Sequence, residues 1–177
     1  MEEINRFVVF KLDEQQFALY LSSVKRIAHA VEVTPLPKAP DIVMGVINLQ
    51  GQIVPVVNIR KRFRFPERRM ELSDYFVIGR TPERLVAILV DDIGEIVEIS
   101  KKKVINTGQI LPGIDYIKGA VKVEGNIVLI HDLDRFLSLE EEQQIDEAIK
   151  HTKNAKKPAK KVANRTKSEK KQKKVKK

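Results

Sequence analysis

The stretch IVMGVINLQGQIVPVVN, residues 42–58, consists of two short apolar runs on either side of a polar turn. Both runs are rich in valine and isoleucine, which favour strands, and Gly51 stands where a tight turn needs positive φ. Asn58 follows the second run at the N-cap position of a short helix, because its side-chain oxygen can accept a hydrogen bond from the first turn. The stretch therefore predicts a β-hairpin that leads into a helical turn.

The same pattern returns in the second half of the chain at a constant offset. The matching pairs are Asp41 and Asp115, Gly45 and Gly119, Gly51 and Gly125, Ile53 and Ile127, Val54 and Val128, Asn58 and Asp132, and Ile59 and Leu133. A looser match near the start of each half pairs Phe7 with Phe76, Val8 with Val77 and Ala18 with Ala87. Any two β-hairpins share some features, but agreement at the turn glycines and the helix caps favours two related β units.

Further short β-branched runs flank both copies of the pattern. They cover residues 7–10, 17–21, 75–79, 85–90 and 96–99 and are separated by turn signals. Many short strands with frequent turns are typical of a barrel or a sandwich. A unit of about five strands closes more readily into a small barrel than it remains an open sheet, because closure removes exposed edges.

A helix is expected after the second unit. Ser138 and Glu141 have the spacing of a capping box, and acidic residues crowd the first turn, where they suit the helix dipole. The apolar residues available for a buried stripe are Leu139, Ile145, Ala148 and Ile149. The sequence predicts a helix over residues 138–151 that docks on the body through this stripe.

The charge of the chain is distributed unevenly. Of the 33 Lys and Arg residues, fourteen lie in residues 150–177, where Glu169 is the one acidic residue, and the rest of the chain is mildly acidic. Residues 152–177 contain few apolar side chains, so we expect a disordered Lys-rich tail. Such a tail is either a solubilising extension or a contact for an anionic membrane or an acidic protein. No aromatic residue follows Phe136, so specific nucleic-acid recognition by base stacking is not expected.

The sequence offers no arrangement typical of catalysis. It contains no cysteine, and its three histidines are not spaced as metal ligands. The cluster at His131 and Asp132 is explained by the capping role expected for Asp132. Asp91 and Asp92 are adjacent in an extended segment, where neighbouring side chains point to opposite faces. We therefore expect no enzyme activity, no metal and no cofactor.

Residues 36–60, LPKAPDIVMGVINLQGQIVPVVNIR, resemble the signature segment of the CheW-type chemotaxis coupling proteins. The segment VDDIGEI at residues 90–96 looks like the second-unit motif of the same family. The resemblance extends over residues 5–151 and does not cover the tail. It implies a mainly β fold, with two tandem SH3-like five-stranded β-barrel subdomains, short helices, a C-terminal helix and a groove between the barrels.

The resemblance also sets the expected domain boundaries. One CheW-like domain would occupy residues 1–151. Within it, subdomain 1 would span about residues 14–72, subdomain 2 about 73–137 with strand 5–12 shared or swapped, and the helix 138–151, followed by the tail 152–177.

The function that the resemblance implies is scaffolding without catalysis. One surface would bind the regulatory domain of the histidine kinase CheA and another the cytoplasmic tip of a methyl-accepting chemoreceptor. The chain has no secretory pattern and no apolar run near the roughly 20 residues of a membrane span, so we expect a cytoplasmic protein associated with membrane-bound receptor arrays. The alternative is a basic-tailed β-barrel protein that binds nucleic acid.

Six residues are expected at the partner surfaces: Val24, Arg26, Asn48, Gln50, Gly51 and Phe76. Core packing is the alternative role for Val24 and Phe76, and an ordinary exposed turn is the alternative for Gln50. Relatives usually have Arg where this chain has Gln50, and often Glu where it has Arg26. Because an uncharged Gln cannot form a bidentate pair with a carboxylate, either the two positions compensate for each other or the partner differs.

Overall fold

The computed structural model describes residues 1–106 and 114–155 and is mainly β. Its strands are β1 (Ile4–Leu12), β2 (Gln15–Tyr20), β3 (Val24–His29), β4 (Val43–Leu49), β5 (Gln52–Val57), β6 (Tyr75–Arg80), β7 (Leu85–Val90), β8 (Asp92–Ser100), β9 (Ile117–Val123) and β10 (Asn126–His131). Its helices are α1 (Ile59–Phe63) and α2 (Leu139–Ala155), with 3-10 turns η1 (Leu21–Ser23), η2 (Lys101–Lys103) and η3 (Leu133–Arg135). Within residues 1–106 and 114–155, none of the helices has the length and hydrophobicity of a membrane span.

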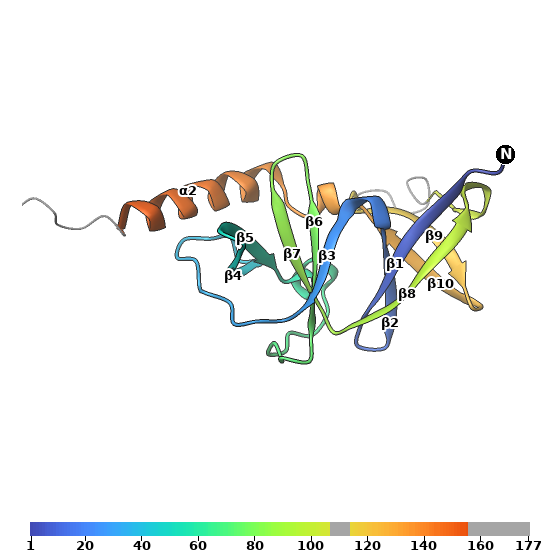
Figure 1. Ribbon diagram of the computed structural model, residues 1–177, viewed down its shortest axis with the longest axis horizontal. Helices are drawn as coiled ribbons and strands as arrows, with labels where there is room; N and C mark the ends of the chain where they lie inside the picture. The colour runs from blue at the N-terminus through green and yellow to red at the C-terminus, as the bar shows by residue number, and fades with distance from the viewer. Residues whose placement is uncertain (107–113, 156–177) are drawn as a thin grey trace, which may run out of the picture.

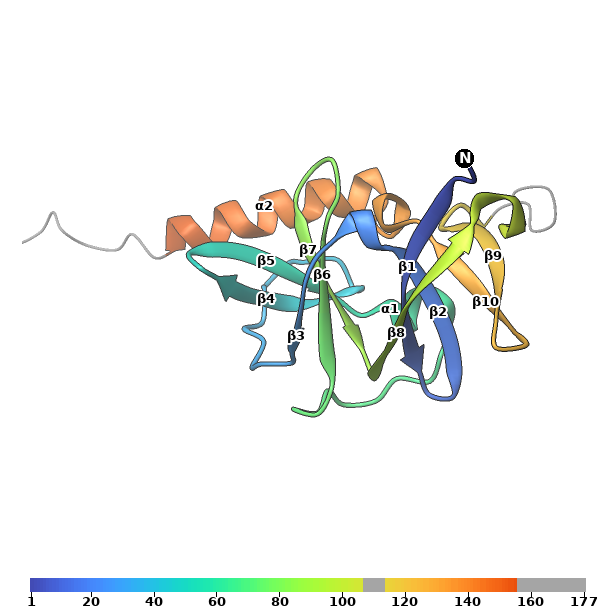
Figure 2. The same ribbon diagram turned by 45° about the vertical axis from the view of Figure 1, so that its right-hand side comes forward.

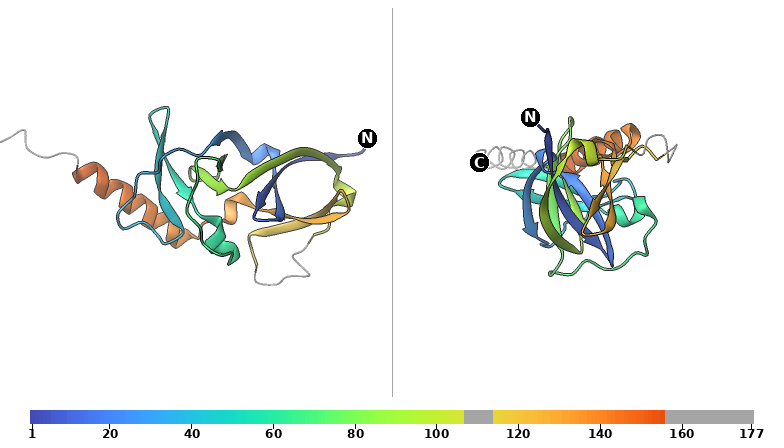
Figure 3. Two further views of the ribbon diagram at one scale, coloured as in Figure 1. Left: turned by 90° about the horizontal axis from the view of Figure 1, so that it is seen from below. Right: turned by 90° about the vertical axis from the view of Figure 1, so that its right-hand side faces the viewer.

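The strands form two five-stranded sheets, which lie side by side in Figure 1. Sheet A has the order β8-β1-β2-β10-β9, and sheet B has the order β3-β6-β7-β5-β4. Figure 3 shows both sheets strongly curved, as expected for small barrels. The predicted fold class is therefore confirmed, with α2 running along the side of sheet B and away from sheet A (Figures 1 and 2).

The two sheets exchange hairpins. The β1–β2 hairpin joins the last three strands of the second half in sheet A, and the β6–β7 hairpin joins the last three strands of the first half in sheet B. This grouping differs from the division expected near residue 72, which placed β2 with the first unit and β6 and β7 with the second. The boundary was misplaced because sequence order does not state which sheet a hairpin enters.

The repeat seen in the sequence corresponds to matching strand registers. In each sheet, the two strands of the hairpin are antiparallel to each other. One strand of the hairpin has a parallel neighbour, and the other has an antiparallel neighbour at the edge of the sheet. Corresponding pairs are Val9–Ala18 and Ile78–Ala87 in the hairpins, Ile130–Ala18 and Val56–Ala87 between parallel strands, and Ile96–Val8 and Ile27–Val77 at the edges. The two β units are thus related in three dimensions as well as in sequence.

The predicted turns and caps are present. Gln50 and Gly51 have φ of 52° and 86°, which gives the β4–β5 hairpin a two-residue turn of the kind that matches strand twist. Asn58 accepts a hydrogen bond from the Arg60 N–H at 3.1 Å, and Asp132 accepts one from the Asp134 N–H at 3.1 Å. Local sequence signals therefore set both hairpins and the turns that follow them.

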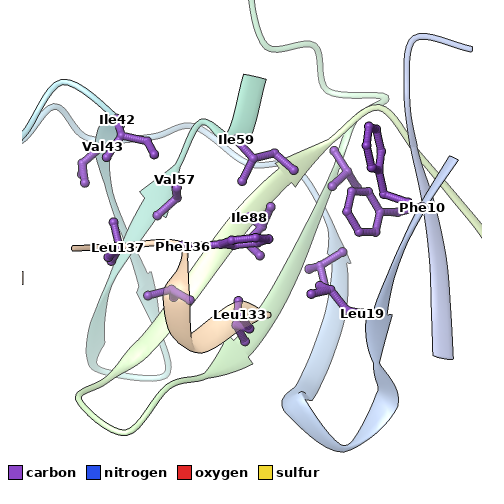
Figure 4. Packing of buried hydrophobic residues seen from close by; sticks show 14 of the residues in the cluster. Phe10, Leu19, Ile42, Val43, Val57, Ile59, Ile88, Leu133, Phe136 and Leu137 are labelled. Atoms are coloured by element: carbon purple, nitrogen blue, oxygen red, sulfur yellow. The ribbon is translucent and has the colours of Figure 1, made fainter. Parts of the chain in front are cut away.

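A central core joins the two sheets. Figure 4 shows Phe10 and Leu19 from sheet A facing Ile88 and Val57 from sheet B, with Phe136 packed between the elements. Each sheet also has a smaller core of its own. Because the largest cluster takes side chains from both sheets, the sheets are held together by hydrophobic packing.

Helix α2 begins with the predicted capping box. The Glu141 N–H donates to Ser138 Oγ at 3.2 Å, and the Ser138 N–H donates to the Glu141 carboxylate at 2.7 Å. Ile145 and Ala148 are fully buried, but Leu139 is 81% exposed, so its predicted place in the stripe was wrong. It lies in the first turn, off the face that Ile145 and Ala148 share. The helix also continues to Ala155, past the expected end at residue 151.

Candidate partner-binding site

Strand β3 offers the first candidate surface. It is an edge strand of sheet B, and its Lys25, Arg26, Ile27 and His29 side chains are exposed. The pairing of β3 with β6 shifts register between Val24 and Arg26, which is a local bulge. An edge strand has unpaired backbone groups that can accept a strand or a peptide from a partner. We call these four exposed residues the edge patch.

The β4–β5 turn offers the second candidate surface. Asn48 Oδ1 accepts a hydrogen bond from the Gly51 N–H at 2.8 Å, so Asn48 fixes the turn and does not only face solvent. Gln50 is exposed at the tip, and an added Cβ on Gly51 would meet nothing within 4 Å. We call Asn48, Gln50 and Gly51 the turn patch, which is the exposed end of the β4–β5 hairpin.

The structure does not bring all six expected residues together. The edge patch and the turn patch lie on β3 and at the end of β4, which are the opposite edges of sheet B, with three strands between them in the hydrogen-bonded order. Within residues 1–106 and 114–155, no hydrogen bond or ion pair joins Arg26 to Gln50. Direct compensation between these two positions therefore has no support in the geometry.

Val24 and Phe76 have core roles. Phe76 is 1% exposed and belongs to the inner cluster of sheet B, so its expected place at a partner surface was wrong. The reason is that its ring packs into the inner cluster of sheet B, with side chains from β4, β5 and β7. Val24 is half-buried and packs against the central core, so only part of its side chain is open to a partner.

An ion cluster between the two sheets was missed by the sequence analysis. The buried Arg60 guanidinium on α1 pairs with Asp13 at 2.8 Å and with Asp91, and it donates to the Pro66 carbonyl at 2.9 Å. Arg68 pairs with Asp91 at 2.7 Å. Asp13 is in the β1–β2 turn of sheet A, so the cluster ties that hairpin to α1 and the loop of sheet B. We call this set the inter-sheet ion cluster.

The paired groups of the inter-sheet ion cluster shift each other's pKa in the direction that keeps both groups charged. The hydrogen bond from Arg60 lowers the pKa of Asp13, and the bond to Asp13 raises the pKa of Arg60. Arg68 is held by the buried Asp74 carboxylate at 2.6 Å, which raises its pKa further above the ordinary range. No sequence pattern predicted this cluster, because its members come from separate turns and loops.

The two residues of the His131–Asp132 pair have different structural roles. Asp132 acts as a cap, as expected, whereas His131 is 2% exposed and surrounded by aromatic rings. In the part of the chain that the structure describes, no group of three or more His, Asp or Glu side chains is placed to hold a metal ion.

Comparison with known proteins gives the family context for these surfaces. The CheW-like domain family matches residues 6–141 of the chain. The chemotaxis protein CheW of Treponema pallidum is 30% identical over 150 residues, which cover 81% of this chain and 88% of that protein. The chemotaxis protein CheW of Thermotoga maritima is 31% identical over 130 residues, covering 72% and 84%.

A solved structure supports the same fold. The scaffolding protein TtCheW from Thermoanaerobacter tengcongensis superposes with a TM-score of 0.72 at 23% identity and covers 80% of this chain and 96% of that chain. The match in sequence spans both sheets and most of their connections. The chain therefore belongs to the family of CheW-like domain proteins.

Proposed function

We propose that this protein is a non-enzymatic adaptor that couples chemoreceptors to the histidine kinase CheA in bacterial chemotaxis signalling arrays. The observation that carries the proposal is the family match over residues 6–141, together with 30% identity to a chemotaxis protein CheW along most of both chains. A protein with this role needs two stable surfaces and no reactive groups. It would act in the cytoplasm, at the membrane-bound receptor arrays.

The geometry of sheet B supports two separate contacts. The edge patch lies on β3 and the turn patch at the β4–β5 turn, so two partners can bind without competing for the same strand. We propose that the regulatory domain of CheA and the receptor tip divide these surfaces between them. Arg26 gives the edge patch a positive charge, and Gln50 gives the turn patch a neutral hydrogen-bonding group.

Binding measurements with purified partners test this proposal. We expect the protein to bind the regulatory domain of CheA and a receptor-tip fragment in calorimetric titrations, and Arg26→Glu to weaken one of these complexes about tenfold. Arg64→Glu is the matched control, because Arg64 is an exposed arginine at the end of α1, outside both patches. Absence of binding to both partners would overturn the adaptor role.

The Lys-rich tail is a candidate for a third contact, separable from the two patches. Residues 156–177 lie outside the described part of the chain, whereas residues 152–155 belong to α2 and not to the expected tail. We propose that the tail's positive charge favours an anionic membrane, at on the order of 1 kcal/mol per basic residue near the surface. Vesicles containing anionic lipid should retain the full chain and release a chain ending at Ala155. Neutral vesicles are the control.

The alternative function, nucleic-acid binding by the barrels, can be tested with the same truncated protein. If the barrels themselves bound nucleic acid, salt-sensitive binding would survive removal of the tail. We expect a chain ending at Ala155 to show no such binding. The family match gives this alternative no support.

A further inference from the structure

Strand β8 is an open edge of sheet A. Among the described residues it has one neighbouring strand, β1, so one row of its backbone N–H and C=O groups faces no partner strand. Asp92, Glu95, Ile96 and Glu98 are exposed along β8, and Ile96 is 57% exposed. We call these four residues the acidic edge. An extended peptide can add a strand to such an edge through backbone hydrogen bonds, so sheet A has a place for one more segment of chain.

The carboxylates of the acidic edge are available for a partner. In the part of the chain that the structure describes, Asp92 and Glu95 form no ion pair, and the Asp92 carboxylate accepts a hydrogen bond from the adjacent Ile93 N–H at 2.9 Å. Glu98 pairs with Arg6 at 2.8 Å, but both side chains are more than half exposed, and such pairs contribute little. A segment that binds here therefore needs positive charges on either side of an apolar side chain.

The equivalent edge of sheet B has no such carboxylates. Strand β3 takes the place in sheet B that β8 takes in sheet A, beside the first strand of the hairpin. Arg26 and His29 stand on β3 where β8 has Glu95 and Glu98. A basic segment is therefore attracted to β8 and not to β3, which provides a comparison within the same molecule.

The chain itself contains a segment with the required composition. Residues 156–177, which follow α2, include twelve Lys and Arg residues and one acidic residue, Glu169. The last five residues, 173–177, read KKVKK, so one apolar side chain stands between two pairs of lysines. Ile96 stands in the same way between carboxylates of the acidic edge. The tail is thus complementary to β8 both in charge and in the order of its residues.

The tail is long enough to reach β8 in its own molecule. Helix α2 runs away from sheet A and ends at Ala155, so the tail has to return along the body (Figure 1). A chain of 22 residues spans up to about 75 Å when extended, about three times the roughly 25 Å length of α2. A tethered segment has an effective concentration in the millimolar range, so even a weak contact holds it in its own molecule.

We propose that residues 156–177 bind the acidic edge of the same molecule, with lysines on Asp92, Glu95 and Glu98 and an apolar side chain beside Ile96. The tail then covers a strand edge that would otherwise be free to pair with other chains. A tail bound in this way is withdrawn from an anionic membrane, so the two contacts compete. This inference does not depend on the adaptor role.

The test places a spin label in the tail, because the chain has no cysteine of its own. Ser168→Cys attaches one nitroxide to the full-length protein without removing a lysine, and the relaxation of backbone amides is measured by NMR at low salt. We expect the label to relax the amides of β8 at least about threefold more than those of β3. In 1 M salt, where the Debye length is about 3 Å, this difference should disappear.

Two double variants show whether the carboxylates of β8 hold the tail. Asp92→Asn with Glu95→Gln should abolish the difference, whereas Glu32→Gln with Glu83→Gln, which removes two exposed carboxylates from loops of sheet B, should keep it. The comparison of β8 with β3 in the labelled protein does not depend on these variants. Equal relaxation of the two strands, or a difference that survives Asp92→Asn with Glu95→Gln, would overturn the proposal.

A mixed sample separates the tail of the same molecule from that of a second copy. Spin-labelled chains without isotope enrichment are mixed with isotope-enriched chains that carry no label, so only contacts between molecules relax the observed amides. We expect no relaxation of β8 in this mixture. Relaxation as strong as in the singly labelled protein would assign the contact to a second copy and overturn the intramolecular proposal.

Discussion

At the scale of the residue, His131 and Asp132 are neighbours with different surroundings. Asp132 caps η3 and was recognised by its match to Asn58 in the repeat. His131 is the last residue of β10, and its ring turns into the aromatic cluster between sheet A and α1. The sequence placed this histidine at the end of an apolar strand, but the rings that enclose it come from four separate segments.

The buried His131 should make stability depend on pH. The unfolded chain binds a proton near pH 6.5, whereas the folded protein does so only at about pH 3. Between these values the unfolded state holds one more proton, so the free energy of unfolding falls as pH falls, by about 1.4 kcal/mol per pH unit. Urea unfolding between about pH 6.5 and 4.5 measures this slope, above the range in which Asp and Glu dominate.

His131→Leu should remove this slope, and His151→Leu, at an exposed histidine on α2, should keep it. Asp13 adds a dependence of the same sign at lower pH. Its pKa is lower in the folded protein than in the unfolded chain, so it stabilises the fold at pH values above its unfolded pKa. This stabilisation is lost as the pH falls through the folded pKa. If the slope above pH 4.5 is the same with and without His131, the histidine is not buried in its neutral form.

At the scale of the element, β4 is shaped by a close approach of the chain to itself. Thr34 and Val46 exchange both backbone hydrogen bonds, at 2.9 and 2.8 Å, and Ile105 and Ala120 repeat this arrangement in the other unit. Gly45 and Gly119 lie beside these bridges. A Cβ on Gly45 would be 2.2 Å from the Thr34 carbonyl oxygen, so the strand needs glycine for space.

Two glycines of the same hairpin should respond differently to alanine. Gly45→Ala should lower the free energy of unfolding by about 3 kcal/mol or more, because the clash is with backbone at φ of 153°. Gly51→Ala should cost about 1 kcal/mol, since its φ of 86° is unfavourable for alanine but nothing crowds the site. Urea denaturation of both variants checks this, and equal losses would contradict it.

At the scale of the whole molecule, two exchanged hairpins hold the sheets together. Each sheet takes strands from both halves of the chain, so neither half makes a complete sheet from its own strands. The central core spans both sheets, and the inter-sheet ion cluster adds directional contacts at their junction.

Loss of Arg60 should weaken this junction. Arg60→Ala removes a buried guanidinium and leaves Asp91 paired only with Arg68. We expect the free energy of unfolding to fall by about 2–3 kcal/mol. The loss is smaller than for a fully buried ion pair, because Asp13 is 48% exposed. Arg6→Ala is the matched control. Its ion pair with Glu98 is exposed, and its loss should cost less than about 0.5 kcal/mol. Similar losses in the two variants would show that the cluster does not stabilise the junction.

The sequence by itself determined the local structure of this protein. Hairpin turns, caps and the capping box of α2 are encoded by a few neighbouring residues, through positive φ, side-chain acceptors and strand alternation. The repeat contains these signals twice. The repeat and the family resemblance together predicted the two related β units.

The tertiary structure alone decided which partners the elements take. Both hairpins have similar apolar faces, so the choice of sheet depends on packing between segments far apart in the chain. The same non-local packing buried Phe76, enclosed His131 and gathered Arg60, Asp13 and Asp91. The turn at Gln50 and Gly51 was predicted because a turn is local, whereas burial and ion pairing depend on neighbours that only the folded chain supplies.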